Sequence, residues 1–207
     1  MSIRKIVKYG ETTLRQPSKE VSKVSKKIQT LVYDLVDTMY AQNGVGLAAP
    51  QVGENLRIFV IDVSTGNQPL NPIVFINPKI IHKSGACSSY EGCLSFPEAY
   101  TDVKRYANVK VKAIDLKGKP FVMEAKEGSL LARAIQHEYD HLDGILFIDH
   151  CRNRFEADKI LAEKGLAPIE PERLVDEPEL EKALESLPLN PGDTVLPQSQ
   201  EGETNVD

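Results

Sequence analysis

The first third of the chain carries hydrophobic residues with the period of a helix. Between residues 26 and 43 they recur every three to four positions, which is the spacing of one helical face. These apolar positions are Ile28, Leu31, Leu35 and Met39. The Asn43-Gly44 pair that follows is typical of a helix C-terminus. The pattern therefore predicts an amphipathic helix over residues 26–43.

Four other stretches have the composition or the alternation of β-strands. Residues 56–63 and 73–76 are rich in β-branched side chains and are bounded by Asn, Pro or Gly, so each is predicted to be a strand. Over residues 108–116 apolar residues alternate with lysines, which predicts a strand with one exposed face. A Lys-Gly-Lys-Pro turn then leads into residues 121–125, and the two segments predict a β-hairpin.

Two more helices are predicted in the second half of the chain. Ser129 and Gly144 stand at capping positions and bound a helix over residues 129–144. A last helix is predicted over residues 152–164. Because strands and helices do not alternate regularly, we predict an α+β fold. In this fold mainly antiparallel strands pack around the helix at 129–144, and a C-terminal helix and tail follow.

Residues 165–207 differ in composition from the rest of the chain. They contain 11 acidic and 2 basic residues, whereas residues 1–164 contain 19 acidic and 23 basic residues. Prolines are frequent there and Phe, Tyr and Trp are missing, so the segment lacks the side chains of a packed core. We therefore expect a catalytic domain over 1–164 and a largely disordered acidic, Pro-rich extension over 165–207. Within it, Pro178–Leu187 has the apolar spacing of a short helix.

The overall composition excludes several classes of protein. The chain has 207 residues, of which 41% are hydrophobic and 27% charged, as in ordinary globular domains. No apolar run approaches the roughly 20 residues of a membrane helix, and the N-terminus lacks the pattern of a signal peptide. Three scattered cysteines, Cys87, Cys93 and Cys151, do not form a disulfide framework. We therefore expect a cytoplasmic protein that has neither DNA nor a membrane as a partner.

The strongest chemical motif is His137-Glu138-Tyr139-Asp140-His141, an H-E-x-x-H pattern. On a helix, residues four apart share a face, with Cβ atoms about 5–6 Å apart. Two imidazoles so placed can bind one metal ion while the glutamate reaches a water molecule on that ion. The motif therefore predicts two metal ligands, His137 and His141, and a candidate general base, Glu138.

A catalytic metal site needs a third protein ligand, and the sequence offers more than one. Position 147, ten residues after the first histidine, is a phenylalanine, whereas Glu156 and Glu163 lie on the following helix. Upstream, Cys93 stands in Glu91-Gly92-Cys93-Leu94-Ser95, a sequence typical of a tight turn. A single cysteine is more often a small buried hydrophobe, so spacing alone does not select Cys93.

A third stretch, Gly44-Val45-Gly46-Leu47-Ala48-Ala49-Pro50-Gln51, contains four Gly or Ala residues. Small residues after a helix indicate that the backbone approaches another group closely. No G-K-[ST] sequence follows, so the stretch is not a phosphate-binding loop. Packing of a helix against a strand explains it equally well.

Taken together, GVGLAAPQ, EGCLS and HEYDH resemble the three signature motifs of the peptide deformylase family, in order and in spacing. The resemblance covers about residues 3–164. It implies an enzyme that removes the formyl group from N-formylmethionyl nascent chains, with the ribosome as a transient partner. The implied cofactor is one Fe2+ ion per chain, which Zn2+, Ni2+ or Co2+ can replace.

The same resemblance implies a role for each motif residue. Cys93, His137 and His141 would bind the metal, whose bound hydroxide would be the nucleophile. Glu138 would be the general base and acid. The remaining implied roles are oxyanion stabilisation by Gln51 and the backbone N–H of Leu94, and substrate binding by Gly46. In addition, three residues are candidates for lining the methionine pocket: Val45, Leu130 and Ala134.

One departure from the family pattern concerns the glutamate of the cysteine motif. Many members place an arginine shortly after the Pro-Glu pair, where this chain has Tyr100. The partner of Glu91 is then a different residue, and Arg105 is the candidate. Three other functions stay open: a zinc endopeptidase using Glu163, a thiol hydrolase using Cys93 and His137, and a non-catalytic metal-binding module.

Overall fold

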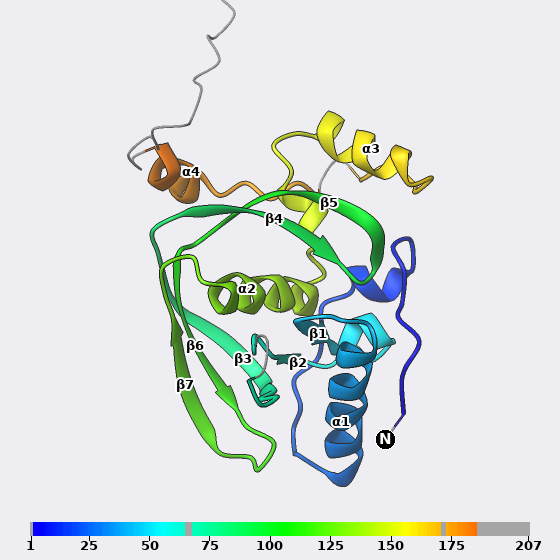
Figure 1. Cartoon of the computed structure of the whole chain (residues 1–207), viewed down its shortest axis with the longest axis vertical. Helices are drawn as coiled ribbons and strands as arrows, with labels where there is room; N and C mark the ends of the chain where they lie inside the picture. The colour runs from blue at the N-terminus through cyan, green and yellow to red at the C-terminus, as the bar shows by residue number, and fades with distance from the viewer. Residues whose placement is uncertain (1, 65–67, 171–172, 186–207) are drawn as a thin grey trace, which may run out of the picture.

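A five-stranded antiparallel sheet forms the framework of the molecule (Figure 1). The computed structural model describes residues 2–64, 68–170 and 173–185. The strands lie in the order β1-β2-β3-β6-β7. Their bounds are β1 Gly46–Ala48, β2 Ile58–Ile61, β3 Ile73–Ser84, β6 Asn108–Ile114 and β7 Pro120–Ala125. The predicted hairpin of β6 and β7 is present, with Val109 paired to Ala125 and Ile114 to Pro120.

A separate two-stranded sheet consists of β4 (Cys87–Cys93) and β5 (Phe96–Arg105). The two strands are antiparallel, and Leu94 and Ser95 form the turn between them. Figure 1 shows this hairpin passing across helix α2 on the side opposite the five-stranded sheet. The turn therefore carries Cys93 toward the middle of the molecule.

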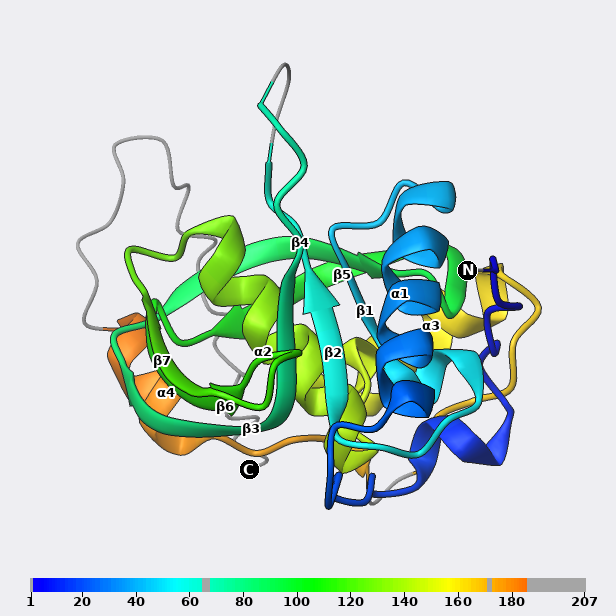
Figure 2. The ribbon, with the colours of Figure 1, turned by 90° about the horizontal axis from the view of Figure 1, so that it is seen from below.

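Within the described residues, four α-helices and three short 3-10 helices complete the fold. The α-helices are α1 Lys26–Ala41, α2 Leu130–Asp143, α3 Arg154–Glu163 and α4 Pro178–Glu185. The 3-10 helices are η1 Thr12–Arg15, η2 Ala49–Val52 and η3 Phe147–His150. In Figure 2, α1 and α2 lie on opposite sides of strand β2. Among the described residues, no helix combines the length and the apolar character needed to cross a bilayer.

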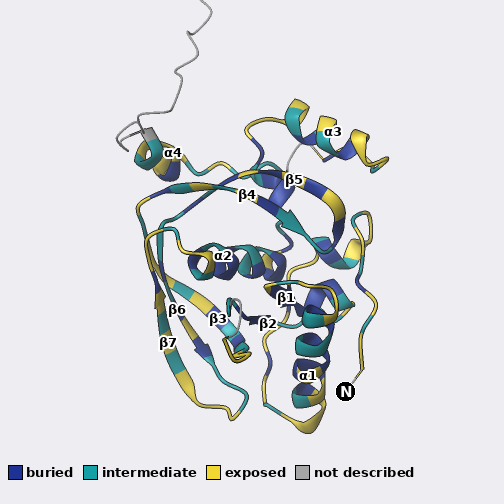
Figure 3. Cartoon of the chain, in the orientation of Figure 1, coloured by how far each residue is buried: buried dark blue, intermediate teal, exposed yellow. Residues whose placement is uncertain are grey.

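The buried apolar side chains of the described residues form three clusters. Figure 3 shows where the buried residues lie along the ribbon. One cluster packs the apolar face of α1 against β1, β2 and β3, with Leu35 and Met39 at its centre. The second packs α2 against the other face of the same sheet. The third joins the β4–β5 hairpin to η1, η3, α3 and the start of the extension. Helix α2 therefore lies between two apolar layers, which fixes the position of its motif residues.

The predicted helix ends agree with the capping groups. The Ser25 hydroxyl accepts from Ile28 N at the start of α1, and the Ser129 hydroxyl accepts from Ala132 N at the start of α2. Gly144 ends α2 with a φ of 73°, a left-handed conformation that suits glycine. The mixture of helices with antiparallel sheets also agrees with the predicted α+β class.

Two strand predictions differ from the structure. Strand β3 does not end at Ile76 but continues to Ser84, because an irregular register between Ile76 and Lys79 takes Asn77 and Pro78 into the strand. The β4–β5 hairpin was not predicted. The buried face of β5 includes the polar residues Thr101 and Arg105. The strand therefore lacks the regular alternation of apolar and polar residues by which a strand is recognised in a sequence.

The first part of the extension packs on the body rather than standing apart. Ile169 and Leu180 are buried, and α4 contains most of the helix that apolar spacing predicted from Pro178. Glu181 forms an ion pair with Lys104 at 2.9 Å. Leu187 and the rest of residues 186–207 lie outside the described residues. In residues 173–185, Leu180 is buried and α4 is formed, whereas the expectation that most of the extension is disordered stays a prediction.

Candidate metal centre and active-site cleft

Three potential metal ligands from distant parts of the chain converge beside α2. They are Cys93 at the end of β4 and His137 and His141 on α2, and their ligand atoms all lie within 4.8 Å of one another. Cys93 Sγ is 3.3 Å from His141 Nε2. In the described part of the chain this is the one group of three or more side chains able to hold a metal ion. The structure thus brings Cys93, which spacing alone left undecided, next to both histidines.

The chemistry of these donors fits a divalent transition metal. One thiolate and two imidazoles leave a fourth position of a tetrahedral ion open, which is the pattern of catalytic rather than structural sites. Burial alone would raise the pKa of Cys93, but the neighbouring His141 and His137 hold it well below its usual value. A thiolate is therefore the favoured form of Cys93, and the thiolate is the form that binds metal.

Glu91 determines which nitrogen of His137 faces the cluster. Glu91 Oε2 lies 3.1 Å from His137 Nδ1. Burial tends to raise the pKa of Glu91, but Arg105 and the hydrogen bond from His137 lower it to about 2. Because an ionised carboxylate only accepts, Nδ1 carries the proton and Nε2 is left as the ligand atom.

Arg105 is the partner of Glu91, as the sequence suggested. Its Nε and Nη2 donate to the two carboxylate oxygens of Glu91 at 3.1 and 3.0 Å. Its Nη1 donates to Asp140 Oδ2 at 2.6 Å, and His150 Nε2 lies 2.8 Å from that same oxygen. Neither Asp140 nor His150 was among the predicted site residues. Asp140 stands inside the H-E-x-x-H motif, but its contact with Arg105 is visible only in the three-dimensional structure.

Glu138 lies against the backbone of β1. A Cβ atom added to Gly46 would overlap Glu138 Oε1, so only glycine leaves room for this carboxylate. The glycine at position 46 of the GVGLAAPQ stretch is explained by this close approach. Glu138 Oε2 is buried and has no hydrogen-bond partner in the described residues. Burial raises the pKa of Glu138 to about 7, although His137 and His141 oppose the shift.

Gln51 is buried next to the cysteine, and its side chain is held by the backbone N–H of Ala48. Its Oε1 accepts from Ala48 N at 2.9 Å, and its Nε2 lies 3.4 Å from Cys93 Sγ and 3.4 Å from Ser95 Oγ. The carboxamide N–H groups are therefore directed at the metal cluster. Leu94 lies in the adjoining turn, where Lys8 Nζ donates to its carbonyl at 2.8 Å.

A cleft of about 500 Å³ opens onto this cluster. Gln51, Cys93, His137 and Glu138 are among its lining residues. All the residues expected to bind substrate line it as well, namely Val45, Gly46, Leu130 and Ala134. A volume of this size accommodates a small ligand or a few residues of a peptide. Tyr90 and Arg133 also line the cleft, although neither was among the predicted site residues.

The alternative third ligands are not part of the cluster. Glu156 and Glu163 lie on α3, and neither belongs to the group of candidate ligands. Glu156 Oε2 instead accepts from Arg152 N at 3.2 Å. The endopeptidase hypothesis therefore lacks its glutamate ligand among the described residues.

The fold and the site together define a class of protein. The fold is α+β, and one cysteine, two histidines and a buried glutamate meet at the base of a cleft, which is the residue set of a hydrolytic enzyme with a candidate metal centre. A family model described as polypeptide deformylase matches residues 3–156. The chain belongs to this family of hydrolases.

Curated relatives and solved structures agree with the family match. Peptide deformylase 1 of Clostridium acetobutylicum is 50% identical over 149 residues, which are 72% of this chain and 95% of that protein. The crystal structure of a Synechococcus elongatus peptide deformylase in complex with actinonin has a TM-score of 0.74 at 42% identity, covering 79% of this chain and 89% of the other. A Legionella pneumophila peptide deformylase has a TM-score of 0.69 at 41% identity, covering 81% and 100%.

Proposed function

We propose that this chain hydrolyses the N-terminal formyl group of N-formylmethionyl polypeptides and releases formate. The observation that carries the proposal is the convergence of Cys93, His137 and His141 beside the buried Glu138. A structural neighbour from Acinetobacter baumannii, 34% identical with a TM-score of 0.68, has Met-Ala-Ser bound. A peptide that begins with methionine is therefore a suitable occupant for the corresponding cleft here.

The metal proposed for this site is Fe2+, with Zn2+, Ni2+ or Co2+ as substitutes, held by Cys93 Sγ and the two histidines. Such an ion supplies Lewis acidity, which makes water more acidic and polarises the formyl carbonyl. Glu91 orients His137 for this role through the 3.1 Å contact with Nδ1. Imidazole and thiolate ligands accept several divalent ions, so the donor set is compatible with each of these metals.

Glu138 moves the proton during hydrolysis. Its carboxylate accepts a proton from the attacking water as the water oxygen bonds to the formyl carbon. When the carbon–nitrogen bond breaks, the same proton passes to the leaving amine, so formate and a free amino terminus are the products. A pKa of about 7 suits a group that must accept and then donate a proton near neutrality.

Gln51 and Leu94 stabilise the negative charge that develops on the formyl oxygen. The Gln51 carboxamide is already fixed by Ala48 N and aimed at the cysteine, so it needs little reorganisation. The backbone N–H of Leu94 is the second proposed donor. Losing one donor of this kind typically lowers the rate constant by about 10²–10³-fold.

The cleft walls bind the rest of the substrate. Gly46 lets the substrate backbone approach Glu138, and Val45, Leu130 and Ala134 contact the methionine side chain. The formyl group is the smallest acyl group, so a crowded site excludes an acetyl group by its volume. The proposed substrates are nascent chains, which makes the ribosome a transient partner and the cytoplasm the place of the reaction.

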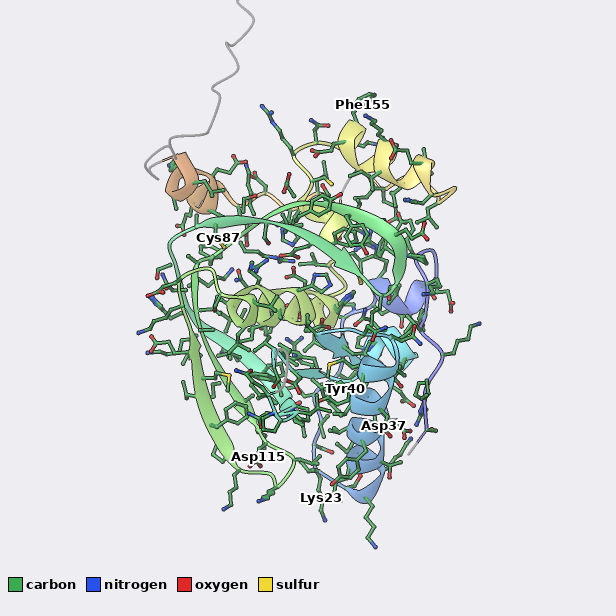
Figure 4. All side chains as sticks on the ribbon, in the orientation of Figure 1. Lys23, Asp37, Tyr40, Cys87, Asp115 and Phe155 are labelled. Carbon is green, nitrogen blue, oxygen red and sulfur yellow. The ribbon has the colours of Figure 1, made fainter. Side chains whose placement is uncertain are left out.

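The decisive experiment combines metal analysis with formate release in two cysteine variants. We expect Cys93→Ala to lose bound metal and formate release, because it removes the thiolate ligand. Cys87→Ala is the matched control, since Cys87 lies outside the cluster, at the start of β4 (Figure 4). Its metal content and activity should equal those of the unmodified chain. Full activity of the chelator-treated, metal-free protein would overturn the proposal.

A second variant separates an enzyme from a metal-binding module. Glu138→Gln preserves the shape of the side chain but removes the proton-accepting oxygen. We expect this variant to retain its metal and its thermal stability and to lose formate release by at least about 10²-fold. Unchanged turnover in Glu138→Gln would show that Glu138 does not transfer the proton.

A further inference from the structure

Two stacked tyrosines stand at the mouth of the cleft. The rings of Tyr90 and Tyr100 have centroids 5.6 Å apart and an interplanar angle of 15°. Both residues line the same cleft as Cys93 and Glu138. They are nevertheless exposed, at 69% for Tyr90 and 52% for Tyr100. Two large rings stacked in contact with solvent form an apolar surface that the core does not require.

The backbone of the hairpin fixes this pair. Tyr100 is directly opposite Gly92 in the β4–β5 register, and its ring covers the glycine so closely that a Cβ atom there would overlap it. Tyr90 is two residues from Gly92 and therefore points to the same face of β4. The two rings form one flat surface that begins immediately before the metal ligand Cys93. We call Tyr90 and Tyr100 the tyrosine pair.

The tyrosine pair points to the opposite face of β4 from Glu91 and Cys93. Glu91 and Cys93, which alternate with it along β4, point toward His137 and His141. Among the described residues β4 pairs only with β5, so an extended peptide can lie along its other edge. If the methionine of that peptide points toward Leu130 and Ala134 on α2, the next side chain points to the opposite face.

We propose that the tyrosine pair selects an aromatic side chain at the residue that follows N-formylmethionine. This inference rests on the proposed deformylase function. An aromatic ring stacks on a flat aromatic surface and removes apolar area from water, which a glycine or a small polar residue cannot do.

The size of the effect follows from ordinary aromatic stacking. An aromatic pair changes an equilibrium or a relative rate by about 2- to 10-fold. We therefore expect kcat/KM for formyl-Met-Phe-Ser amide to exceed that for formyl-Met-Gly-Ser amide by about 2- to 10-fold. Formyl-Met-Leu-Ser amide should fall between them, because leucine is apolar but does not stack.

The test compares this ratio in variants of the tyrosine pair. Tyr90→Ala should bring the Phe-to-Gly ratio close to one, and Tyr100→Phe should retain it because the ring remains. Tyr33→Ala is the control: Tyr33 is also exposed but lies on α1, away from the cleft, so its kcat/KM values should equal those of the unmodified chain. Tyr90 is the most exposed of the three, so its replacement is compatible with the native fold.

The outcomes distinguish the two proposals. If the unmodified chain releases formate from all three peptides at equal kcat/KM, the selectivity is refuted and the deformylase function stands. A Phe-to-Gly ratio that persists in Tyr90→Ala also refutes it. If no formyl peptide is hydrolysed by the metal-loaded chain, the proposed function itself fails.

Discussion

A single buried arginine holds together the polar groups behind the proposed metal ligands. Arg105 is 3% exposed and forms ion pairs with Glu91 and with Asp140. Glu91 in turn contacts His137, so Arg105 reaches a proposed metal ligand through one intervening residue. Glu91 is buried and Asp140 is partly buried, and this one guanidinium compensates the charge of both carboxylates. Its role is therefore to position His137 while keeping both carboxylates ionised.

Replacing Arg105 should be costly because it removes the guanidinium that pairs with the buried Glu91 and the partly buried Asp140. We expect Arg105→Ala to lower the free energy of unfolding by about 3–5 kcal/mol and to weaken metal binding by about 10–100-fold. Arg105→Lys should restore only part of both, since an ammonium group cannot bind the two oxygens of Glu91 in parallel.

The matched control is Arg154→Ala. Arg154 forms an exposed i,i+4 pair with Asp158 on α3, and pairs of that kind contribute about 0.5 kcal/mol or less. Urea unfolding and metal titration measure both quantities. Equal stability losses in the Arg105 and Arg154 variants would contradict the role assigned to Arg105.

At the scale of elements, the end of α2 is the junction that orients the H-E-x-x-H residues. Gly144 closes the helix with φ of 73°, and Ile145 N then donates to Asp140 O. Segment 12–15 packs directly on this turn, where a Cβ atom at Gly144 would lie 2.6 Å from Arg15 O. Glycine is needed here for two reasons, its backbone conformation and the space it leaves.

Comparison with Gly165, which follows α3, separates these two reasons. Gly165 has a similar φ of 65°, but nothing lies within 4 Å of a Cβ atom placed there. We expect Gly165→Ala to cost about 1 kcal/mol from the left-handed conformation alone. Gly144→Ala should cost at least about 1 kcal/mol more, because the methyl group displaces segment 12–15. Thermal unfolding of the two variants measures the difference, and equal costs would rule out the proposed contact.

At the scale of the whole molecule, residues beyond the family match complete the third apolar cluster. The match ends at residue 156, yet Ile169 is 1% exposed and belongs to the cluster that contains Leu14 and Phe147. Val175 N also donates to Asp149 O at 2.8 Å. The start of the extension is therefore part of the folded body, on the side that supports β5 and η3.

The stability of the body should depend on this contact. We expect Ile169→Ala to lower the free energy of unfolding by about 2–4 kcal/mol, because it leaves a cavity beside Leu14. Phe155→Ala is the control: Phe155 is larger but is 79% exposed and points outward from α3 (Figure 4). Its replacement should change stability by about 0.5 kcal/mol or less. A stability loss in Ile169→Ala no larger than in Phe155→Ala would place Ile169 outside the core.

Local signals in the sequence were sufficient for the helices, for the β6–β7 hairpin and for the motif residues. Periodicity and capping depend on neighbours three to four positions apart, so the caps Ser129 and Gly144 were recognisable without a structure. The histidine pair was likewise visible, since both members stand on one helical turn. The β4–β5 hairpin was not, because its buried face includes Arg105, whose partners lie far away in the chain.

The sequence by itself determined which residue types are available for chemistry and which short segments form helices or strands. Only the tertiary structure decided that Cys93, rather than Glu163, joins the histidines 44 residues further along. It also decided that Asp140 and His150 contact Arg105, and that the rings of Tyr90 and Tyr100 meet. The physical reason is the range of the interactions. Helix and turn preferences act between near neighbours, whereas ligand convergence and burial depend on how distant segments pack.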